Sequence, residues 1–328
     1  MTASIRRTLY AHLPGVRLDN ADAPLAGGRI TRLPFDDWAR LESEFEFAQR
    51  EYDNSQPTFW VWDRLTDDAE DSDRWVVKEL TELHTAFLLD HRVPLLPSPL
   101  LSSCYIQHIP PPEYADTINF AVKRLIGPAE RELVVYGDPL TYSYSAEHLA
   151  AVARRLQFLR DNKTWEFNDE ISAAIRVLEE TTRPDSWYGG DLVVTQVHGF
   201  VRCMAACEGL LLPDEVKTDI TQTFGRRAAT VINTSPERKQ QYEQYFIELY
   251  RLRSHLIHGN ASKIRSDPQF EEKLASGRVL LRYLIMSAIY VRNRMPAPSP
   301  LWQLLHDCTR DHNLENRLRT ILADRPNL

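Results

Sequence analysis

The pattern of apolar positions along the chain changes near residue 140. After this point, apolar residues recur every three or four positions, which is the spacing of helices that bury one face. Short proline-containing connections separate several of these segments, and such connections favour antiparallel neighbours in a helical bundle. The pattern predicts helices over Ala146–Asp161, Asp169–Thr182, Asp191–Leu212, Asp214–Thr230, Glu237–His258, Phe270–Arg294 and Trp302–Leu322.

The first 140 residues show no such regularity. Prolines and glycines are frequent in residues 1–35, and further prolines between 94 and 112 interrupt any helix there. The sequence therefore predicts a mainly α fold, in which a helical bundle over 141–328 follows a smaller α+β domain over 1–140. The elements expected in the smaller domain are irregular structure or short strands over residues 1–35, helices over Phe35–Tyr52 and Trp75–Asp90, a strand over Leu101–Ile109, and a hairpin of Ile118–Leu125 with Glu132–Tyr136.

The composition is that of an ordinary globular protein, with 43% hydrophobic and 26% charged residues among 328. No apolar run approaches the roughly 18 to 20 residues that a membrane-spanning helix needs, and the amino terminus lacks a secretory signal pattern. We therefore expect a cytoplasmic protein without a membrane partner. Residues 1–150 carry 14 basic and 24 acidic residues, against 25 and 22 in residues 151–328. The net charge of −7 argues against indiscriminate nucleic-acid binding.

Several common kinds of site lack support in the sequence. The histidines show no HExxH spacing, and there is neither a phosphate-binding glycine loop nor a G-x-S-x-G motif. Cys203 and Cys207 are four residues apart on a predicted helix and could hold half of a metal site. No second Cys or His pair follows at a suitable spacing, and no CxxC pair exists. We expect neither a metal nor a cofactor.

One arginine falls on the apolar side of its predicted helix. Leu249 and Leu252 belong to a stripe of apolar residues, and Arg253 lies only about 40° from Leu249 around the helix axis. A charge in that position is costly unless it is paired or reserved for an anionic ligand. Glu208 occupies a seam position of the predicted helix Asp191–Leu212. We therefore predict that Glu208 pairs with Arg253 and orients its guanidinium.

His258 follows Arg253 by five residues, which corresponds to a rotation of about 140°. The two side chains therefore do not share a face of one regular helix. Two explanations remain open. The last turn unwinds at Gly259 and Asn260, or two copies of the helix pair across a two-fold axis and bring both arginines and both histidines to a common cleft.

Two segments resemble a known family. Residues 249–259, from Leu249 to Gly259, look like the Tyr-x-x-Arg-Ser-x-x-x-His-Gly pattern of Apea-like HEPN domains. Residues 205–211, which contain Glu208, are similar to that family's segment of small residues followed by Glu-x-Leu-Leu. Together the two segments cover roughly 190–295, about a third of the chain. The resemblance implies a HEPN-type helical bundle.

HEPN domains of this kind are commonly homodimeric, metal-independent endoribonucleases, and some act in antiviral defence or as toxins. The resemblance implies that Arg253 binds the scissile phosphate of RNA and that His258 exchanges protons with the attacking 2'-hydroxyl or the leaving 5'-oxygen. The products would be a 2',3'-cyclic phosphate and a 5'-hydroxyl. Ser254 would add a polar contact at the site. A regulatory protein partner is also compatible with this family.

Alternative interpretations use the same residues differently. The helical domain could be a non-catalytic module that binds nucleotide, RNA or a protein, or a scaffold in which the Glu208–Arg253 pair only fixes the register of two helices. His258 could merely be a favourable residue at a helix carboxyl end. His255 is assigned to the rim of the site, and Arg251, about 160° from Leu249, to the solvent-exposed face.

Overall fold

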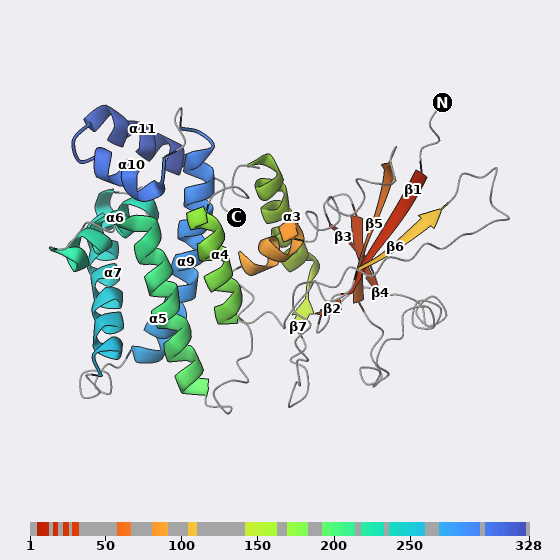
Figure 1. Cartoon of the computed structure of the whole chain (residues 1–328), viewed down its shortest axis with the longest axis horizontal. Helices are drawn as coiled ribbons and strands as arrows, with labels where there is room; N and C mark the ends of the chain where they lie inside the picture. Colours follow the sequence, from red (N-terminus) through yellow and green to blue (C-terminus); the bar gives the residue numbers. More distant parts are fainter. Residues whose placement is uncertain are drawn as a thin grey trace. The chain divides into compact units, whose positions relative to one another are not determined.

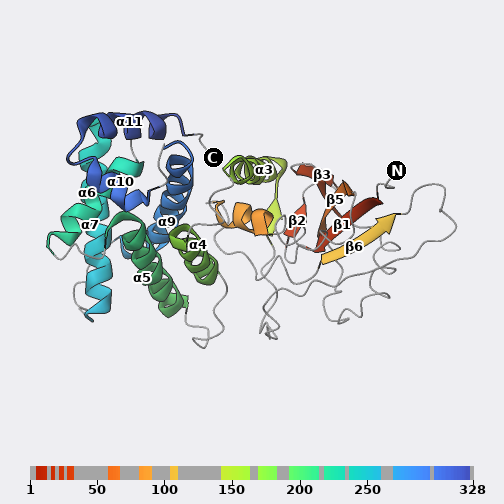
Figure 2. The ribbon, with the colours of Figure 1, turned by 45° about the horizontal axis from the view of Figure 1, so that its top comes forward.

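The structure is a computed structural model that describes residues 5–12, 16–18, 22–25, 28–32, 58–66, 81–90, 104–109, 142–162, 169–182, 192–213, 218–232, 236–259, 269–295 and 299–325. The protein is mainly helical, as the sequence predicts. Its chain divides into two compact units, one of residues 1–92 with 96–158 and one of 93–95 with 159–328. Residues 142–158, which we assigned to the helical domain, belong to the first unit. Figures 1 and 2 show the described elements in two views.

The first unit contains a five-stranded antiparallel sheet in the order β3-β4-β5-β1-β6, and β2 and β7 form a separate parallel pair. Leu25, Ile30 and Val61 are buried on its strands. The expected strand over Leu101–Ile109 is confirmed where it is described. The strand bounds are β1 Ile5–His12, β2 Val16–Leu18, β3 Asp22–Leu25, β4 Gly28–Arg32, β5 Thr58–Thr66, β6 Cys104–Ile109 and β7 Tyr142–Tyr144.

Two helical segments complete the described part of the first unit. Residues 81–88 are helical, in agreement with the helix expected over Trp75–Asp90, and Leu83 and Phe87 are buried there. The second segment is α3 (Ala146–Asp161), whose bounds are those predicted and whose residues up to Phe158 belong to this unit. The helix expected over Phe35–Tyr52 and the hairpin of Ile118–Leu125 with Glu132–Tyr136 lie outside the described residues.

The second unit is built from helices. The long helices α5 and α9 pack against each other, α4 contacts both, and α7 packs mainly against α6 and also contacts α5 (Figure 1). Buried apolar residues on α5 and α9, such as Phe200, Met204, Leu281 and Ile285, form the centre of this core. The helix bounds are α4 Asp169–Thr182, α5 Leu192–Leu211, α6 Ile220–Ile232, α7 Pro236–Ile257, α9 Phe270–Arg292, α10 Leu301–Asp307 and α11 His312–Ala323.

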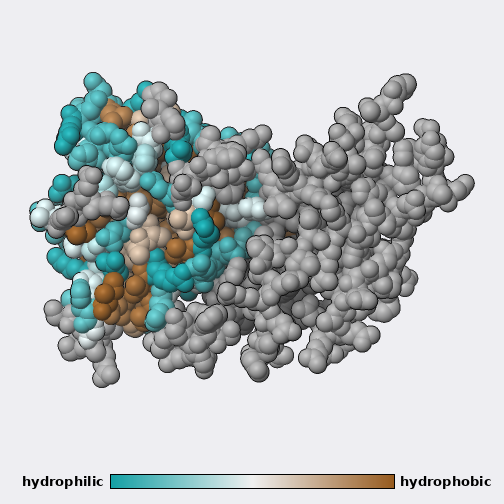
Figure 3. Space-filling view, viewed as in Figure 1, coloured by the Kyte–Doolittle hydropathy of each residue, from teal (hydrophilic) through white to brown (hydrophobic). Residues whose placement is uncertain are grey.

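Helix α9 is apolar enough to span a membrane by length and composition alone, with a mean hydropathy of 1.4 over its most apolar window. Its residues in that window are 72% buried inside the protein, and this degree of burial is typical of a core helix. Among the described residues, no other helix meets the same criteria. Figure 3 shows a group of apolar side chains over α5 on one face of the second unit, between areas of polar side chains.

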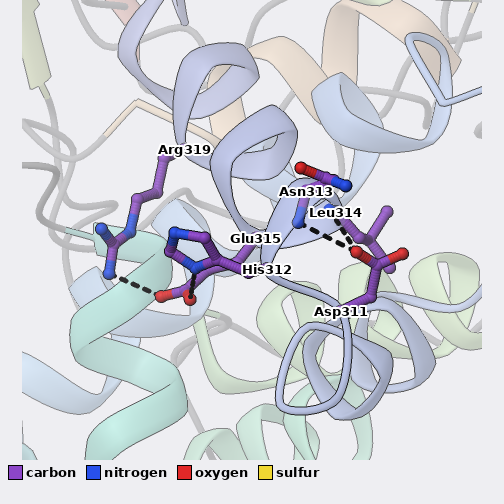
Figure 4. Close-up of polar contacts among 6 residues, drawn as sticks. All are labelled: Asp311, His312, Asn313, Leu314, Glu315 and Arg319. Atoms are coloured by element: carbon purple, nitrogen blue, oxygen red, sulfur yellow. Dashed lines mark hydrogen bonds and ion pairs between the residues drawn. The ribbon is translucent and has the colours of Figure 1, made fainter.

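The helix predicted over Trp302–Leu322 is wrong as a single element, because the chain forms two helices there. Asp311 lies between them with an extended backbone, at φ −127° and ψ 103°. Its carboxylate accepts hydrogen bonds from the backbone amides of Asn313 and Leu314 (Figure 4). This side chain caps the amino terminus of α11 and therefore starts a new helix.

The helix predicted over Asp214–Thr230 begins later than expected. Helix α6 starts at Ile220, and Asp219 before it has a positive φ of 51°. A residue in this left-handed conformation cannot belong to a right-handed helix. The start predicted at Asp214 is therefore wrong.

Candidate site at the carboxyl end of α7

Helices α5 and α7 bring Glu208 and Arg253 together. Glu208 Oε2 lies 3.1 Å from Arg253 Nη2, and the side chains are 29% and 23% exposed. These partly exposed positions allow the pair to be reached by a ligand, although water still screens part of the attraction between the charges. The ion pair predicted from the apolar seams of the two helices is confirmed.

Tyr250 joins this pair from the turn of α7 before Arg253. Its hydroxyl donates a hydrogen bond of 2.9 Å to Glu208 Oε1, and its ring packs against Phe224 with a centroid distance of 4.9 Å. The Arg253 Cζ atom lies 5.4 Å from the centroid of the Tyr250 ring, within the range of a cation–π contact. The sequence interpretation did not include this tyrosine in the site. The available signals were its position three residues before Arg253 and the quoted pattern Tyr-x-x-Arg-Ser-x-x-x-His-Gly, which begins at Tyr250.

Burial raises the pKa of Tyr250 to about 12, and the hydrogen bond and negative charge of Glu208 act in the same direction. The positive charge of Arg253 opposes the shift only in part. The hydroxyl therefore keeps its proton at neutral pH and remains a donor. A tyrosine, a carboxylate and a guanidinium are thus linked in one cluster, which we call the Glu208 cluster (Glu208, Tyr250 and Arg253).

The guanidinium of Arg253 does not use all its donors within this cluster. Among the contacts of the described residues, Nη2 faces Glu208, whereas the buried Nε has no hydrogen-bond acceptor. An arginine has five N–H donors in a planar fork, which suits two oxygens of a carboxylate or a phosphate. An oxyanion in the place of Glu208 could therefore accept from Nε and Nη2 together.

Helix α7 continues regularly up to His258. The His258 amide donates to the Ser254 carbonyl at 3.1 Å, as in an α-helix, and Gly259 has a left-handed φ of +68°, which ends the helix. Unwinding before His258 therefore does not explain how this residue and Arg253 could act together. By helix geometry they remain about 140° apart around the axis. The pairing of two protomers stays a prediction.

The other residues of the motif lie in the last turn of α7. His258 and Gly259 are exposed, Ser254 and His255 are half-buried, and Ile257 is 49% exposed. Arg251 is exposed, as predicted from its angle to the apolar stripe. The structure thus places Arg253 in a charged cluster between two helices and His258 at an open helix end.

The cysteines of α5 lie in the core rather than at an open site. Cys203 and Cys207 are buried, burial raises the pKa of both thiols, and Thr181 lies 3.4 Å from Cys203 Sγ. Within the part of the chain that the structure describes, no group of three His, Cys, Asp or Glu side chains could hold a metal ion.

Comparisons of the chain with models of protein families, with curated proteins and with solved structures found no match. The resemblance to Apea-like HEPN domains therefore rests on the two sequence segments themselves. These segments contain Glu208 on α5 and the motif from Tyr250 to Gly259 on α7. Glu208 contacts Tyr250 and Arg253 where the two helices pack together.

Proposed function

We propose that the protein is a metal-independent endoribonuclease of HEPN type that acts on single-stranded RNA. The observation that carries the proposal is the Glu208–Arg253 ion pair, with 3.1 Å between its charged atoms and with Arg253 five residues before the exposed His258. A permanently charged guanidinium is suited to a phosphate whose charge increases in the transition state. A histidine titrates near neutral pH and is suited to proton transfer.

The proposed reaction needs only side chains and RNA. Glu208 orients the guanidinium of Arg253 before RNA binds, and Arg253 then binds the scissile phosphate. His258 exchanges a proton with the 2'-hydroxyl that attacks phosphorus or with the 5'-oxygen that leaves it. The P–O5' bond breaks as the O2'–P bond forms, which gives a 2',3'-cyclic phosphate and a 5'-hydroxyl. Ser254 and His255 lie close enough along the helix to contact the same strand.

The active form in this proposal is a homodimer, because Arg253 and His258 face different directions on one helix. Pairing of two α7 helices across a two-fold axis would bring Arg253 of one protomer to His258 of the other. In this view the exposed Ile257 lies within the contact between protomers. We further propose that the protein is cytoplasmic and acts in antiviral defence or as a toxin. A regulatory protein partner is part of the same proposal.

One observation favours a non-catalytic alternative. Glu208 already neutralises Arg253, so the arginine could serve to join α5 and α7 while the exposed end of α7 binds nucleotide, RNA or a protein. In that case RNA could bind without being cleaved. Cleavage and binding must therefore be measured separately.

The central test is RNA cleavage in the presence of EDTA. We expect the wild-type protein to cleave mixed single-stranded RNA and His258→Ala to lose about 100-fold or more in rate, the range of general acid–base catalysis. Arg253→Ala should lose activity similarly. Arg251→Ala, on the exposed face of the same helix, and His312→Ala, whose side chain is 79% exposed on α11, are the matched controls and should keep full activity.

The ends of the products provide a second criterion. The 5' ends should accept phosphate from a polynucleotide kinase without prior phosphatase treatment, because they carry a free hydroxyl. Cleavage that requires a divalent metal, or that survives His258→Ala, contradicts the mechanism. Binding of RNA without cleavage, unaffected by His258→Ala, supports the non-catalytic alternative.

A further inference from the structure

The two carboxylate oxygens of Glu208 have different partners. Oε1 accepts the Tyr250 hydroxyl at 2.9 Å, and Oε2 faces Arg253 Nη2 at 3.1 Å. A carboxylate that meets an arginine fork without competition commonly uses both oxygens, in two parallel N–H···O bonds. Here Tyr250 occupies one of them. The ion pair is consequently held by a single oxygen.

Arg253 has one donor without an acceptor in the same cluster. Its Nε is buried and has no acceptor among the described residues, and it is the donor that a second carboxylate oxygen would satisfy. A buried donor without an acceptor is costly. In this cluster the donor Arg253 Nε has no acceptor, while Tyr250 occupies the carboxylate oxygen that could serve it.

The tyrosine itself is firmly placed. Its side chain is 6% exposed, its ring packs against Phe224 of α6, and its hydroxyl keeps its proton at neutral pH. Glu208 is 29% exposed and therefore less enclosed by neighbouring side chains than Tyr250. Tyr250 therefore fixes the carboxylate, rather than the reverse.

We propose that Tyr250 is a positioning residue. By holding Oε1 of Glu208, it limits the Glu208–Arg253 ion pair to one carboxylate oxygen, so that a phosphate of RNA can replace Glu208 on the guanidinium. This inference rests on the proposed function and assigns a role to a residue outside the Arg-x4-His motif. A pair with both oxygens would orient Arg253 equally well but would compete more strongly with the phosphate. Tyr250 thus sets the affinity for RNA without contacting it.

The test uses Tyr250→Phe, which removes the hydroxyl and keeps the ring. Freed from Tyr250, Oε1 can bind Arg253 Nε, so we expect the variant to bind RNA about threefold to tenfold more weakly, the effect of one hydrogen bond. The ligand is a 2'-O-methyl oligonucleotide, which cannot be cleaved by 2'-hydroxyl attack, and its binding is followed by fluorescence anisotropy. With cleavable RNA, KM should rise by the same factor while kcat changes less than about twofold.

The matched control is Tyr245→Phe on the same helix. Tyr245 also loses a side-chain hydrogen bond in this change, a contact of 2.6 Å to Ser276 on α9, but it does not belong to the Glu208 cluster. RNA affinity should stay within twofold of the wild type. A loss in this variant equal to that of Tyr250→Phe shows that any loosening of α7 is sufficient, and overturns the proposal.

A second comparison shows whether Tyr250 acts through Glu208. In a Glu208→Gln background there is no carboxylate to hold, so adding Tyr250→Phe should change RNA affinity by less than twofold. An undiminished effect of Tyr250→Phe in that background overturns the proposal. Unchanged affinity of the single variant Tyr250→Phe overturns it as well.

An RNA-independent measurement separates this inference from the proposed function. In ¹⁵N-labelled protein, the Nε–H signal of Arg253 should move downfield in Tyr250→Phe, because the hydrogen gains a carboxylate acceptor, and should not move in the double variant with Glu208→Gln. If the protein neither binds nor cleaves RNA, the proposed function fails. The Arg253 signal then decides whether Tyr250 controls the pair, and an unmoved signal contradicts that control.

Discussion

Two arginines of the second unit are stabilised in different ways. Arg253 faces a carboxylate, whereas Arg227 of α6 is 7% exposed and has no carboxylate partner among the described residues. Its Nη1 donates to the Leu211 carbonyl at 2.6 Å and to the Trp302 carbonyl at 3.4 Å, and Nη2 lies 3.5 Å from His306 Nδ1. Because Leu211 ends α5, the guanidinium lies at the negative end of that helix dipole. Burial lowers the pKa of Arg227.

Replacing Arg227 with methionine should destabilise the protein. The change keeps much of the side-chain volume but leaves buried carbonyls without a donor, which costs about 1–3 kcal/mol in the free energy of unfolding. Urea denaturation measures the loss. The control is Arg226→Met, whose side chain is 65% exposed and lies 4.0 Å from Glu243, and it should change stability by about 0.5 kcal/mol or less. Equal losses in the two variants contradict the capping role of Arg227.

At the scale of single residues, the sequence supplied the charges of the site but not their geometry. Glu208 and Arg253 interrupt apolar stripes, so their pairing could be inferred from spacing alone. The bond from Tyr250 to Glu208 could not, because it depends on the side-chain conformation and on how α5 and α7 cross. The absence of an acceptor for Arg253 Nε belongs to the same geometry and has no signal in the sequence.

At the scale of helices and strands, regular patterns gave the most accurate predictions. The bounds of α3 and α4 agree with the structure, because apolar spacing and polar ends coincide there. The break between α10 and α11 was missed, although the polar residues 309–313 interrupt the apolar pattern around Asp311. Strand β5 (Thr58–Thr66), which pairs with β1 and β4, was not predicted. Its run of aromatic residues is typical of a strand, but its pairing with β1, about fifty residues earlier, is set by the sheet.

The contact between α6 and α7 depends on one glycine. A Cβ atom at Gly225 would lie 2.5 Å from Ile247 Cγ1 and 2.9 Å from the Glu243 carbonyl oxygen. The carbonyl belongs to the α7 backbone and cannot move without shifting that helix. The absence of a side chain at Gly225 therefore sets how closely α6 approaches α7, and α7 carries Tyr250 and Arg253.

We expect Gly225→Ala to destabilise the protein by about 1–3 kcal/mol, because the two helices must separate. Gly209 provides a matched glycine in a helix. It is exposed near the end of α5, and a Cβ atom there would meet nothing within 4 Å. Gly209→Ala should therefore stabilise by about 0.5–1 kcal/mol. Thermal and urea unfolding of both variants measure the difference. Effects of the same sign contradict a close contact at Gly225.

At the scale of the whole molecule, the direction of His258 relative to Arg253 determines the proposed assembly. One α7 helix presents the two residues about 140° apart, so a shared site requires a second protomer. The acidic first half of the chain, with 24 acidic and 14 basic residues in 1–150, provides no obvious attraction for RNA. Substrate binding in this proposal therefore depends on the second unit.

Mixed dimers test this arrangement directly. If each site combines Arg253 of one protomer with His258 of the other, a heterodimer of Arg253→Ala and His258→Ala protomers keeps one intact site and about half the activity. A heterodimer of wild type with the Arg253→Ala, His258→Ala double variant should then be inactive. The two heterodimers, purified through different tags, are compared by RNA cleavage. The reverse result places each site within one protomer.

The hydrogen bonds at the end of α7 determine how often this part of the helix opens. The amide of Gly259 donates to Leu256 over 3.4 Å in an exposed turn, whereas Arg253 lies beside the buried Leu252 and Tyr250. Exposed helix ends open locally at little cost in free energy, and core turns open only with much of the structure. We therefore expect amide hydrogen exchange to be slow at Arg253 and faster at Gly259. The turn that ends at His258 should therefore open more often than the turn that holds Arg253.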